Sequence, residues 1–573
     1  MNPTANNIPE DGKLYEPDRK EDGTFAFDEN GEPYDYNGDG LVENLIADPQ
    51  NDTNGWFHGL GDRGDDSSRY GYRYKDLGSL ADFSQENQNV AAYLEQATLF
   101  WADMGVNGIR HDATLHMDAA FAKGLKDAVD SHNTITQFGE FFIGRPDPKY
   151  DEYVYFPKQT GINNLDFEFY RAASATFGDF STTMADFGNM LQYTQDDYDY
   201  ENQAVTFLDN HDVTRFGYTQ RSQKTYNAAL ATLLTSRGVP NIYYGTEQYV
   251  VPADGSDVSG RIFMQTDSSF DTDTTAYKLI GKLSELRQQN DAIAYGTTTI
   301  RYSNDDVLIY ERKFYDDVIL VAINRQPDKA YTIDNVETLL PEGEYVDFLG
   351  GMLNGENISV YASTGINTTA SITLDGGEVG IWQYDAAANA PEIGNVVSTM
   401  GRAGNRVYIY GDGLDGNISV KFGETEATVE SNTANEIVTY VPDNAVAGYN
   451  DITVTKGDAV SNSFTYNVLS GDQNQVIFHV KAETSYGENI YIVGNVPELG
   501  SWNPDKCTEA LLNPNYPEWF LPVSVPAGTE IQFKFIKKDA NGTVTWESGD
   551  NRVITSSSLS AGTVDTEVYT WRN

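Results

Sequence analysis

Residues 106–113 read VNGIRHDA, and this stretch decides the fold because of what stands on either side of it. Before it, NVAAYLEQATLFWADMG (89–105) has apolar residues at helical spacing and ends at Gly105. After it, DAAFAKGLKDAV (118–129) has a second helical pattern. The order predicts a helix, a short buried strand and another helix. This is the repeating unit of parallel β/α folds, either an open sheet or a barrel.

The same order recurs further along the chain. TITQFGEFFIG (134–144), AVTFLDNHD (204–212) and VPNIYYGTEQY (239–249) are expected to be strands, and KTYNAALATLLTSRG (224–238) a helix. Three of the strands end in a carboxylate at or just past the apolar run: Asp112, Glu140 and Asp212. The carboxyl ends of barrel strands converge on one mouth, where catalytic groups sit. Taken singly, each acid is better explained as a helix cap or a turn residue.

The rest of the chain divides by composition. Residues 1–80 are rich in Gly, Asp, Asn and Tyr and predict a long irregular region with short strands. Residues 81–290 hold the strand and helix alternation, and after about 290 the helical patterns stop. Residues 291–388 predict one all-β domain, 389–469 a small immunoglobulin-like sandwich, and 470–573 a further all-β domain.

The charge balance excludes several functions. The chain has 86 Asp and Glu against 38 Lys and Arg, a net charge of −48, so nucleic acid and anionic membranes are not expected partners. We interpret this charge as a surface adapted to high salt. Cys507 is the single cysteine, which rules out an internal disulfide. No apolar run is long enough to span a membrane, and the first residues do not form a signal peptide.

Three segments, in order, carry a resemblance to a family. GIRHDATLHM (108–117), FGEFFIG (138–144) and FLDNHDVTRF (207–216) resemble catalytic segments of the α-amylase family of glycoside hydrolases. The stretches 235–249 and 290–314, and the order of the tail domains, are similar to its cyclodextrin glucanotransferase branch. The resemblance implies a multidomain protein: a (β/α)8 TIM barrel followed by three all-β domains.

Compared with that family, the chain is expected to be N-terminally incomplete, with the first barrel strands missing. The resemblance makes 1–80 the loop domain inserted in the barrel, 81–290 the remaining barrel and 291–388 the C domain. It makes 389–469 an IPT/TIG-type immunoglobulin-like domain and 470–573 a starch-binding module.

The resemblance also implies roles for site residues. Asp112 takes the place of the nucleophile, Glu140 that of the general acid/base, and Asp212 that of the third carboxylate. Arg110 would orient the nucleophile and His211 would bond the sugar at the cleaved bond. Retaining cleavage of a glycosidic bond needs two carboxyl groups about 5–5.5 Å apart, one ionised and one protonated.

Further contacts are implied around these residues. Asp257 and Arg261 resemble a pair that binds donor-side glucose, although a solvated ion pair would look the same. His116 and Phe141 are expected to contact substrate, Phe141 through an apolar ring face.

A calcium ion is the implied cofactor, with Asp82 and the His116 carbonyl as ligands. Asp35, Asn37 and Asp39 begin a second, EF-hand-like loop, but Ile46 stands where the closing Glu would be.

In the last domain, Trp502, Lys534, Trp546 and Asn551 match one sugar site of starch-binding modules, and Tyr516 resembles an anchor of the second. Core tryptophans are the alternative explanation.

Two positions depart from the transferase pattern. Gly78 stands where the central aromatic residue is expected, and Leu115 where the acceptor-side lysine is expected. The prediction is a retaining α-1,4-glucan enzyme acting on starch and maltooligosaccharides. It is most similar to a cyclodextrin glucanotransferase working through a glycosyl-Asp112 intermediate, secreted and monomeric. The alternatives are an α-amylase releasing linear sugars, and a starch-binding protein whose barrel is inactive.

Overall fold

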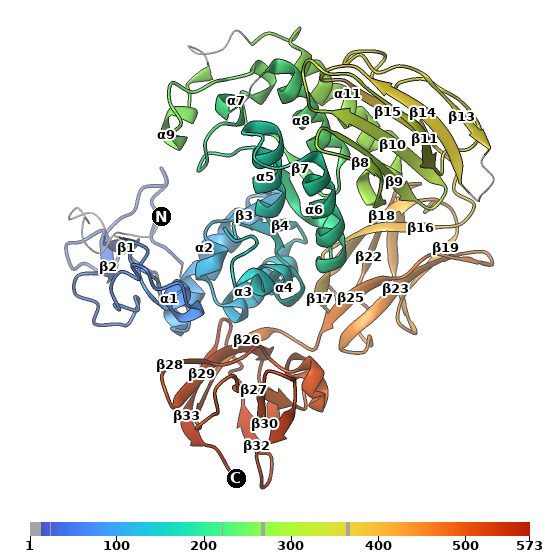
Figure 1. The fold of residues 1–573 in the computed structure, drawn as a ribbon. Helices are drawn as coiled ribbons and strands as arrows, with labels where there is room; N and C mark the ends of the chain where they lie inside the picture. Colours follow the sequence, from blue (N-terminus) through green and yellow to red (C-terminus); the bar gives the residue numbers. More distant parts are fainter. Residues whose placement is uncertain (1–12, 23, 79, 220–221, 265–269, 363–366) are drawn as a thin grey trace. The chain divides into compact units, whose positions relative to one another are not determined.

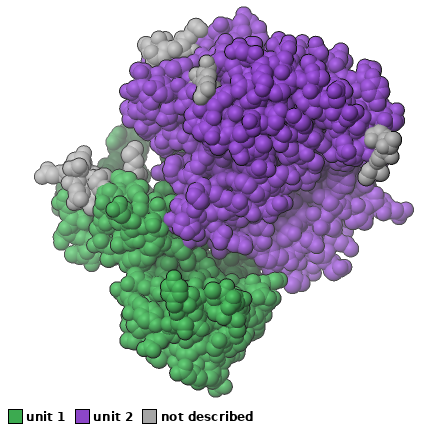
Figure 2. All heavy atoms as spheres, viewed as in Figure 1, with its two compact units in different colours: residues 1–107, 113–133, 469–573 green, residues 108–112, 134–468 purple. Residues whose placement is uncertain are grey.

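The computed structural model describes residues 13–22, 24–78, 80–219, 222–264, 270–362 and 367–573. The chain forms two compact units, coloured separately in Figure 2. Unit 1 comprises residues 1–107, 113–133 and 469–573, and unit 2 comprises residues 108–112 and 134–468. The domain boundaries predicted from composition remain predictions, and each unit is described by itself below.

Unit 2 begins with parallel strands that pair in sequence order, and Figure 1 labels three of them, β3, β4 and β7. Strand β3 (Gly108–His111) pairs with β4 (Thr136–Gly139), and β4 pairs with β5 (Asn163–Asn164). Strand β6 (Val205–Phe207) pairs with β7 (Val239–Asn241), and a parallel bridge from Leu165 to Val205 joins the two groups. Sequential parallel strands separated by helices form an arc of a β/α barrel, so the carboxyl ends of β3, β4 and β6 share one edge.

Helices separate and follow these strands, and most of them begin at a residue whose side chain caps the first turn. Helix α6 begins with a capping box in which Thr183 and Asp186 bond each other's backbone N–H groups. The helices of unit 2 are α4 (Tyr150–Thr160), α5 (Phe167–Ala173), α6 (Met184–Asp197), α7 (Phe216–Thr219), α8 (Gln223–Thr235), α9 (Asp257–Gly260), α11 (Thr275–Gln289) and α12 (Asp291–Tyr295), with a π-helix at Ser174–Gly178.

Two all-β domains complete unit 2. The first has the sheets β15-β10-β9-β8 and β11-β14-β13-β12, and the second has β16-β18-β22-β21 and β17-β25-β23-β19-β20. Their strands are β8 (Thr297–Ser303), β9 (Val307–Phe314), β10 (Asp317–Asn324), β11 (Tyr331–Thr338), β12 (Gly343–Tyr345), β13 (Ile358–Ala362), β14 (Thr368–Leu374), β15 (Val379–Tyr384), β16 (Glu392–Val397), β17 (Met400–Arg402), β18 (Arg406–Asp412), β19 (Ile418–Phe422), β20 (Thr425–Ala427), β21 (Val429–Asn432), β22 (Glu436–Tyr440), β23 (Gly448–Lys456), β24 (Ala459–Val460) and β25 (Phe464–Leu469).

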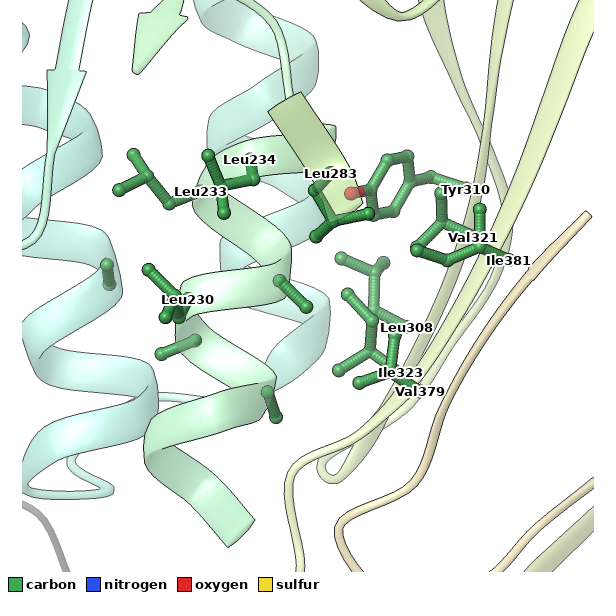
Figure 3. Close-up of a cluster of buried hydrophobic side chains, with 14 of the residues drawn as sticks. Leu230, Leu233, Leu234, Leu283, Leu308, Tyr310, Val321, Ile323, Val379 and Ile381 are labelled. Carbon is green, nitrogen blue, oxygen red and sulfur yellow. The ribbon is translucent and has the colours of Figure 1, made fainter. Parts of the chain in front are cut away.

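One apolar core joins the β/α part to the first all-β domain. Figure 3 shows Leu230 of α8 and Leu283 of α11 on one side, with Leu308 of β9 and Ile323 of β10 on the other. All four side chains are fully buried. Burial of an apolar side chain contributes roughly 1.5–3 kcal/mol, so this shared core fixes the last β/α elements against the sheet.

Unit 1 contains the irregular region, two helices of the β/α pattern and the C-terminal domain. Its last domain is a sandwich of the sheets β28-β29-β26-β33 and β27-β30-β31, with β32 also paired to β30. Helix α3 packs on β26 and β29 of that domain. The elements are β1 (Leu14–Pro17), β2 (Glu43–Ala47), α1 (Arg69–Tyr74), α2 (Gln88–Asp103), α3 (Ala119–His132), β26 (Gln473–Lys481), β27 (Asn489–Gly494), β28 (Leu512–Asn515), β29 (Glu518–Pro526), β30 (Glu530–Lys538), β31 (Val544–Trp546), β32 (Arg552–Thr555) and β33 (Thr563–Thr570).

The structure corrects three sequence expectations. The strand 108–111 was expected to be buried, but only His111 is, because among the described residues β3 pairs with β4 alone. Helix α12 lies beyond residue 290, where helices were expected to stop. Helix α1 lies within the region expected to be irregular with short strands, and Ser68 caps it by accepting from the Gly71 N–H.

Candidate active site

Two carboxylates follow adjacent parallel strands. Asp112 comes directly after β3 and Glu140 directly after β4, and His111 is the register partner of Gly139. The Glu140 N–H donates to the His111 carbonyl over 3.0 Å, which extends the pairing to the strand ends. Ala113 then has a left-handed backbone (φ 52°), so the chain turns sharply after Asp112. Strand pairing therefore brings the two acids side by side.

One guanidinium bridges the two acids. Arg110 forms an ion pair with Asp112 through Nη1, and its Nη2 lies 3.0 Å from Oε2 of Glu140. Exposure differs greatly between the acids, since the Asp112 side chain is 76% exposed and that of Glu140 only 12%. Two chemically similar groups thus occupy different environments.

The environment of Glu140 favours its protonated form. Burial raises its pKa, and the negative charges of Asp112 and Asp212 raise it further, while the Arg110 cation lowers it. The net shift is upward from the ordinary value of 4.5. A carboxyl group whose pKa is raised by its environment is suited to act as a general acid.

The third carboxylate, Asp212, is held by two cationic or potentially cationic groups. His211 Nε2 lies 2.9 Å from its Oδ2, and Arg261 Nη2 lies 3.1 Å from its Oδ1. Arg261 also pairs with Asp257 at 2.9 Å and donates through Nε to the His211 carbonyl. We call Arg110, Asp112, Glu140, His211, Asp212, Asp257 and Arg261 the strand-end cluster.

The structure contradicts the prediction for Phe141. Its ring is 3% exposed and packs on Tyr153 and Phe156 at 5.9 and 5.3 Å between centroids. Side chains alternate along an extended segment, so Phe141 points away from the side of Glu140 and into the core. The exposed ring is that of Phe142, which sequence reasoning passed over.

The proposed calcium ligands lie in unit 1, where Asp82 already has a cationic partner. The buried Asp82 carboxylate accepts from Nδ1–H of His58 at 2.7 Å, and Nε2–H of His58 donates to Glu86 at 3.0 Å. Burial lowers the pKa of His58, but the bonds to Asp82 and Glu86 outweigh it and raise that pKa to about 10. The His116 ring donates to the Tyr72 carbonyl.

These residues, as placed, fit an imidazolium better than a divalent cation. Calcium takes six to eight oxygen ligands, whereas the described part of the chain gathers no cluster of three metal-ligating side chains. In the EF-hand-like loop the carboxylates already accept hydrogen bonds from backbone N–H groups. Asp35 accepts from Gly38 and Gly40, and Asp39 accepts from Leu41. His58 carries the signal that sequence reasoning missed, since it stands 24 residues from Asp82 in irregular chain.

Rings and hydrogen-bonding groups gather on the C-terminal domain. Trp546 is 41% exposed, and Lys534 donates to the carbonyls of Glu547 and Gly549 at 3.2 and 2.6 Å. Asn551 donates to Gln532 at 3.2 Å, and Trp502 is half-buried with φ 65°. Lys534 lies on β30 and Trp546 on the neighbouring strand β31.

Tyr516 is more exposed still. It is 53% exposed, and its hydroxyl accepts from the Thr484 N–H at 3.0 Å. Trp519, by contrast, is buried in the core.

The structure describes Gly78 and Leu115, the two residues predicted to depart from the transferase pattern. Gly78 has φ 63°, and a Cβ there would meet no atom within 4 Å. Leu115 is buried. Gly78 therefore offers no side chain to a ligand, and the buried Leu115 offers no charged group.

Comparison with known proteins assigns each part of the chain. Residues 43–259 match the catalytic domain of alpha amylase, 301–385 its C-terminal all-beta domain, 391–469 an IPT/TIG domain and 473–566 a starch binding domain. The cyclomaltodextrin glucanotransferase of Thermoanaerobacterium thermosulfurigenes is 45% identical over 96% of this chain and 75% of its own length. The chain belongs to the cyclomaltodextrin glucanotransferase family.

Other members agree with this assignment. The enzyme of Geobacillus stearothermophilus is 41% identical over 96% of this chain and 75% of its own. The crystal structure of the γ-cyclodextrin glucanotransferase of alkalophilic Bacillus clarkii superposes with a TM-score of 0.85 at 39% identity, covering 96% of this chain and 79% of that one. The fold is thus the family's TIM-barrel type followed by three all-β domains, as predicted.

Proposed function

We propose that this chain cleaves α-1,4-glucosidic bonds of starch with retention and transfers the glucan to a sugar hydroxyl, forming cyclic and linear maltooligosaccharides. The observation that carries the proposal is the Arg110-bridged pair of Asp112 and Glu140 at adjacent strand ends. Membership of the glucanotransferase family supplies the substrate class.

In the first step, a carboxylate oxygen of Asp112 attacks the anomeric carbon. The bond from that carbon to the bridging oxygen breaks, and Glu140 transfers its proton to this leaving oxygen. Asp112 attacks as a carboxylate that is ion-paired with Arg110, and Glu140 must be protonated, which its burial favours. The product is a glycosyl ester on Asp112 and a free glucan end.

In the second step, Glu140 works as a base. It removes the proton from an incoming hydroxyl, whose oxygen attacks the anomeric carbon and displaces Asp112. When the hydroxyl is the 4-OH of the same glucan a ring forms, and when it belongs to a second sugar the glucan is transferred. Two inversions give net retention.

The remaining cluster residues would stabilise charge and hold the donor. Positive charge develops on the sugar ring in the transition state, and the ionised Asp212 stabilises it electrostatically. His211 and Arg261 position that carboxylate through bonds to both of its oxygens. Asp257 and Arg261 then face the donor glucose units as an ion pair.

The C-terminal domain would hold polymeric substrate. Aromatic rings at Trp502, Trp546 and Tyr516 stack on the apolar faces of pyranose rings. Lys534 and Asn551 bond the sugar hydroxyls. The match of residues 473–566 to a starch binding domain supports this role.

Because His58 already bonds Asp82, calcium binding at Asp82 and the His116 carbonyl is proposed only for a state in which His58 does not hold that carboxylate. His58→Asn removes the cation shared by the buried Asp82 and the half-buried Glu86, so the free energy of unfolding should fall by about 3–5 kcal/mol. Calcium should restore part of that loss. Calorimetry with and without 5 mM calcium measures it, and a variant that calcium leaves unchanged would contradict a site at Asp82.

A polymeric substrate argues for a secreted protein, because starch does not cross membranes. No helix among the described residues is long and apolar enough to span a bilayer. The net charge of −48 suits concentrated salt, because the Debye length at 1 M is about 3 Å and repulsion between like charges further apart is screened. We propose a monomer, consistent with this self-repulsion.

The experiment is chromatography with mass detection of soluble starch incubated with the full chain in concentrated salt and calcium. Cyclic maltooligosaccharides are the expected products. Linear sugars alone would favour an α-amylase, the second candidate, which the missing contacts at Gly78 and Leu115 support. No product from a protein that still binds starch would contradict the enzymatic function.

A further inference from the structure

A groove of about 490 Å³ opens in unit 2, lined by the β/α part, the first all-β domain and the immunoglobulin-like domain. No residue of the strand-end cluster lines it. Its walls carry five aromatic rings, from Tyr200, Tyr295, Phe314, Tyr315 and Phe464. The volume lies within the range of roughly 300–1,000 Å³ typical of small-molecule sites. We call this the seam groove.

The rings present flat surfaces in a fixed arrangement. Tyr200 and Phe464 stack nearly parallel, with centroids 6.0 Å apart and an interplanar angle of 18°. Tyr315 is 39% exposed, and its hydroxyl accepts from the Asn462 N–H at 3.1 Å. An amphipathic ligand with an apolar face and a polar edge fits such a surface.

Tyr315 stands where a tyrosine is conformationally unfavourable. It begins the hairpin turn between β9 and β10 with φ 48°, a left-handed conformation that Gly or Asn adopts readily. Non-glycine residues in this region are often retained at functional sites. Asn462, whose N–H donates to the Tyr315 hydroxyl, belongs to the immunoglobulin-like domain. The Tyr315 side chain is therefore held from both sides of the groove.

Polar groups in the groove suit a neutral ligand. Asn395 accepts from the Val396 N–H and from Gln203 through its carbonyl oxygen, and its amide nitrogen has no partner among the described residues. Glu201 adds a half-buried acceptor, while the Lys313 ammonium is bonded to the Tyr315 carbonyl. The acidic side chains disfavour an anion, and rings with amides favour a polyhydroxylated sugar.

We propose that the seam groove binds a short segment of α-1,4-glucan, separately from both the strand-end cluster and the starch-binding module. The inference rests on the proposed function for its substrate class. It adds a third region of the molecule that holds the polymer, located on the surface shared by the middle domains.

Hydrogen exchange with mass detection tests this on the full chain carrying Asp112→Asn, which prevents turnover. Maltohexaose should slow exchange in the hairpin 310–320 and in 459–466, as well as in the module segments around Tyr516 and Trp546. Tyr315→Gly, which suits the left-handed turn, should abolish protection of the hairpin and of 459–466 only. Tyr361→Ala removes another exposed tyrosine of the same domain and should change nothing.

Three outcomes overturn the assignment. If maltohexaose protects the module but neither groove segment, the seam groove is not a glucan site. If protection of the groove persists in both Tyr315→Gly and Tyr315→Asn, the ring does not contribute and the assignment is wrong. Protection nowhere would contradict the glucan specificity itself, and the groove proposal with it.

Discussion

The strand-end cluster and the starch-binding surface are proposed to hold the same polymer with opposite chemistry. The cluster in unit 2 consists of acids and cations paired across strand ends and loops. The surface in unit 1 consists of exposed rings with one ammonium and one amide, on a sandwich whose core is fully packed. Bond cleavage needs charge where charge develops, whereas adsorption needs only area and hydroxyl contacts. A substitution that abolishes turnover at the strand-end cluster should therefore leave starch adsorption unchanged, and the reverse should hold for the starch-binding surface.

The largest effect is expected at Asp112. Asp112→Asn keeps the shape of the side chain but removes the nucleophile, so turnover of soluble starch should fall at least about a thousandfold, or about 4 kcal/mol in the barrier. Binding to granular starch should not change. Reducing-end and cyclodextrin assays measure the first, and sedimentation with granules the second.

Asp151→Asn serves as the matched control, since this acid begins α4 outside the cluster. Turnover that survives Asp112→Asn would end the nucleophile assignment.

The converse change is Trp546→Ala. Losing this exposed ring should weaken adsorption to granular starch about thirtyfold, or about 2 kcal/mol, as for aromatic anchors at interfaces. The rate on short soluble maltooligosaccharides should stay the same, because they do not need the module. Tyr486→Ala, a fully exposed residue of the same domain, is the control. Equal adsorption by both variants would show that Trp546 is not an anchor.

A smaller effect is expected within the cluster at Arg261. Arg261→Gln removes the cation shared by Asp212 and Asp257, so kcat/KM on starch should fall about tenfold, or about 1.4 kcal/mol. Asp257→Asn leaves the bond to Asp212 and should cost less. Initial rates on defined maltooligosaccharides give both values. A larger loss for Asp257→Asn would reverse the order of importance.

The smallest effect is on stability alone and involves four neighbouring acidic residues of unit 2: Asp291, Asp317, Glu392 and Asp412. Burial and the charge of Asp412 raise the pKa of Asp291 to about 7, and burial with Asp317 and Asp412 does the same for Glu392. A carboxyl whose pKa is raised in the folded state favours folding below its ordinary pKa. That contribution is lost as pH rises to about 7.

Asp291→Asn should therefore raise the midpoint of thermal unfolding at pH 8 by about 2–4 °C and leave it unchanged at pH 4. Calorimetry at the two pH values decides this. The strand-end cluster and the starch-binding surface should keep their function. A midpoint that Asp291→Asn leaves unchanged at pH 8 would show that the charge of Asp291 does not destabilise the folded state.

The sequence predicted the cluster better than its surroundings. Asp112, Glu140 and Asp212 could be named from the sequence because strand ends are visible as apolar runs followed by acids, and the family motifs are contiguous; their catalytic roles stay predictions. Phe141 was misplaced because a motif does not say which way a side chain turns beyond the strand end. The His58–Asp82 bond was missed because irregular chain between them carries no periodicity. Exposure of β3 was missed because burial depends on which strands pair, a tertiary property.

The most direct test of the account traps the covalent intermediate. The full chain is incubated with an α-maltosyl fluoride bearing a further fluorine on the reacting ring, which slows the second step, and is then digested and mapped by mass spectrometry. The account predicts one glycosyl adduct, on Asp112, and none in Asp112→Asn. An adduct on another residue, or cyclic products formed with no trappable ester, would contradict it.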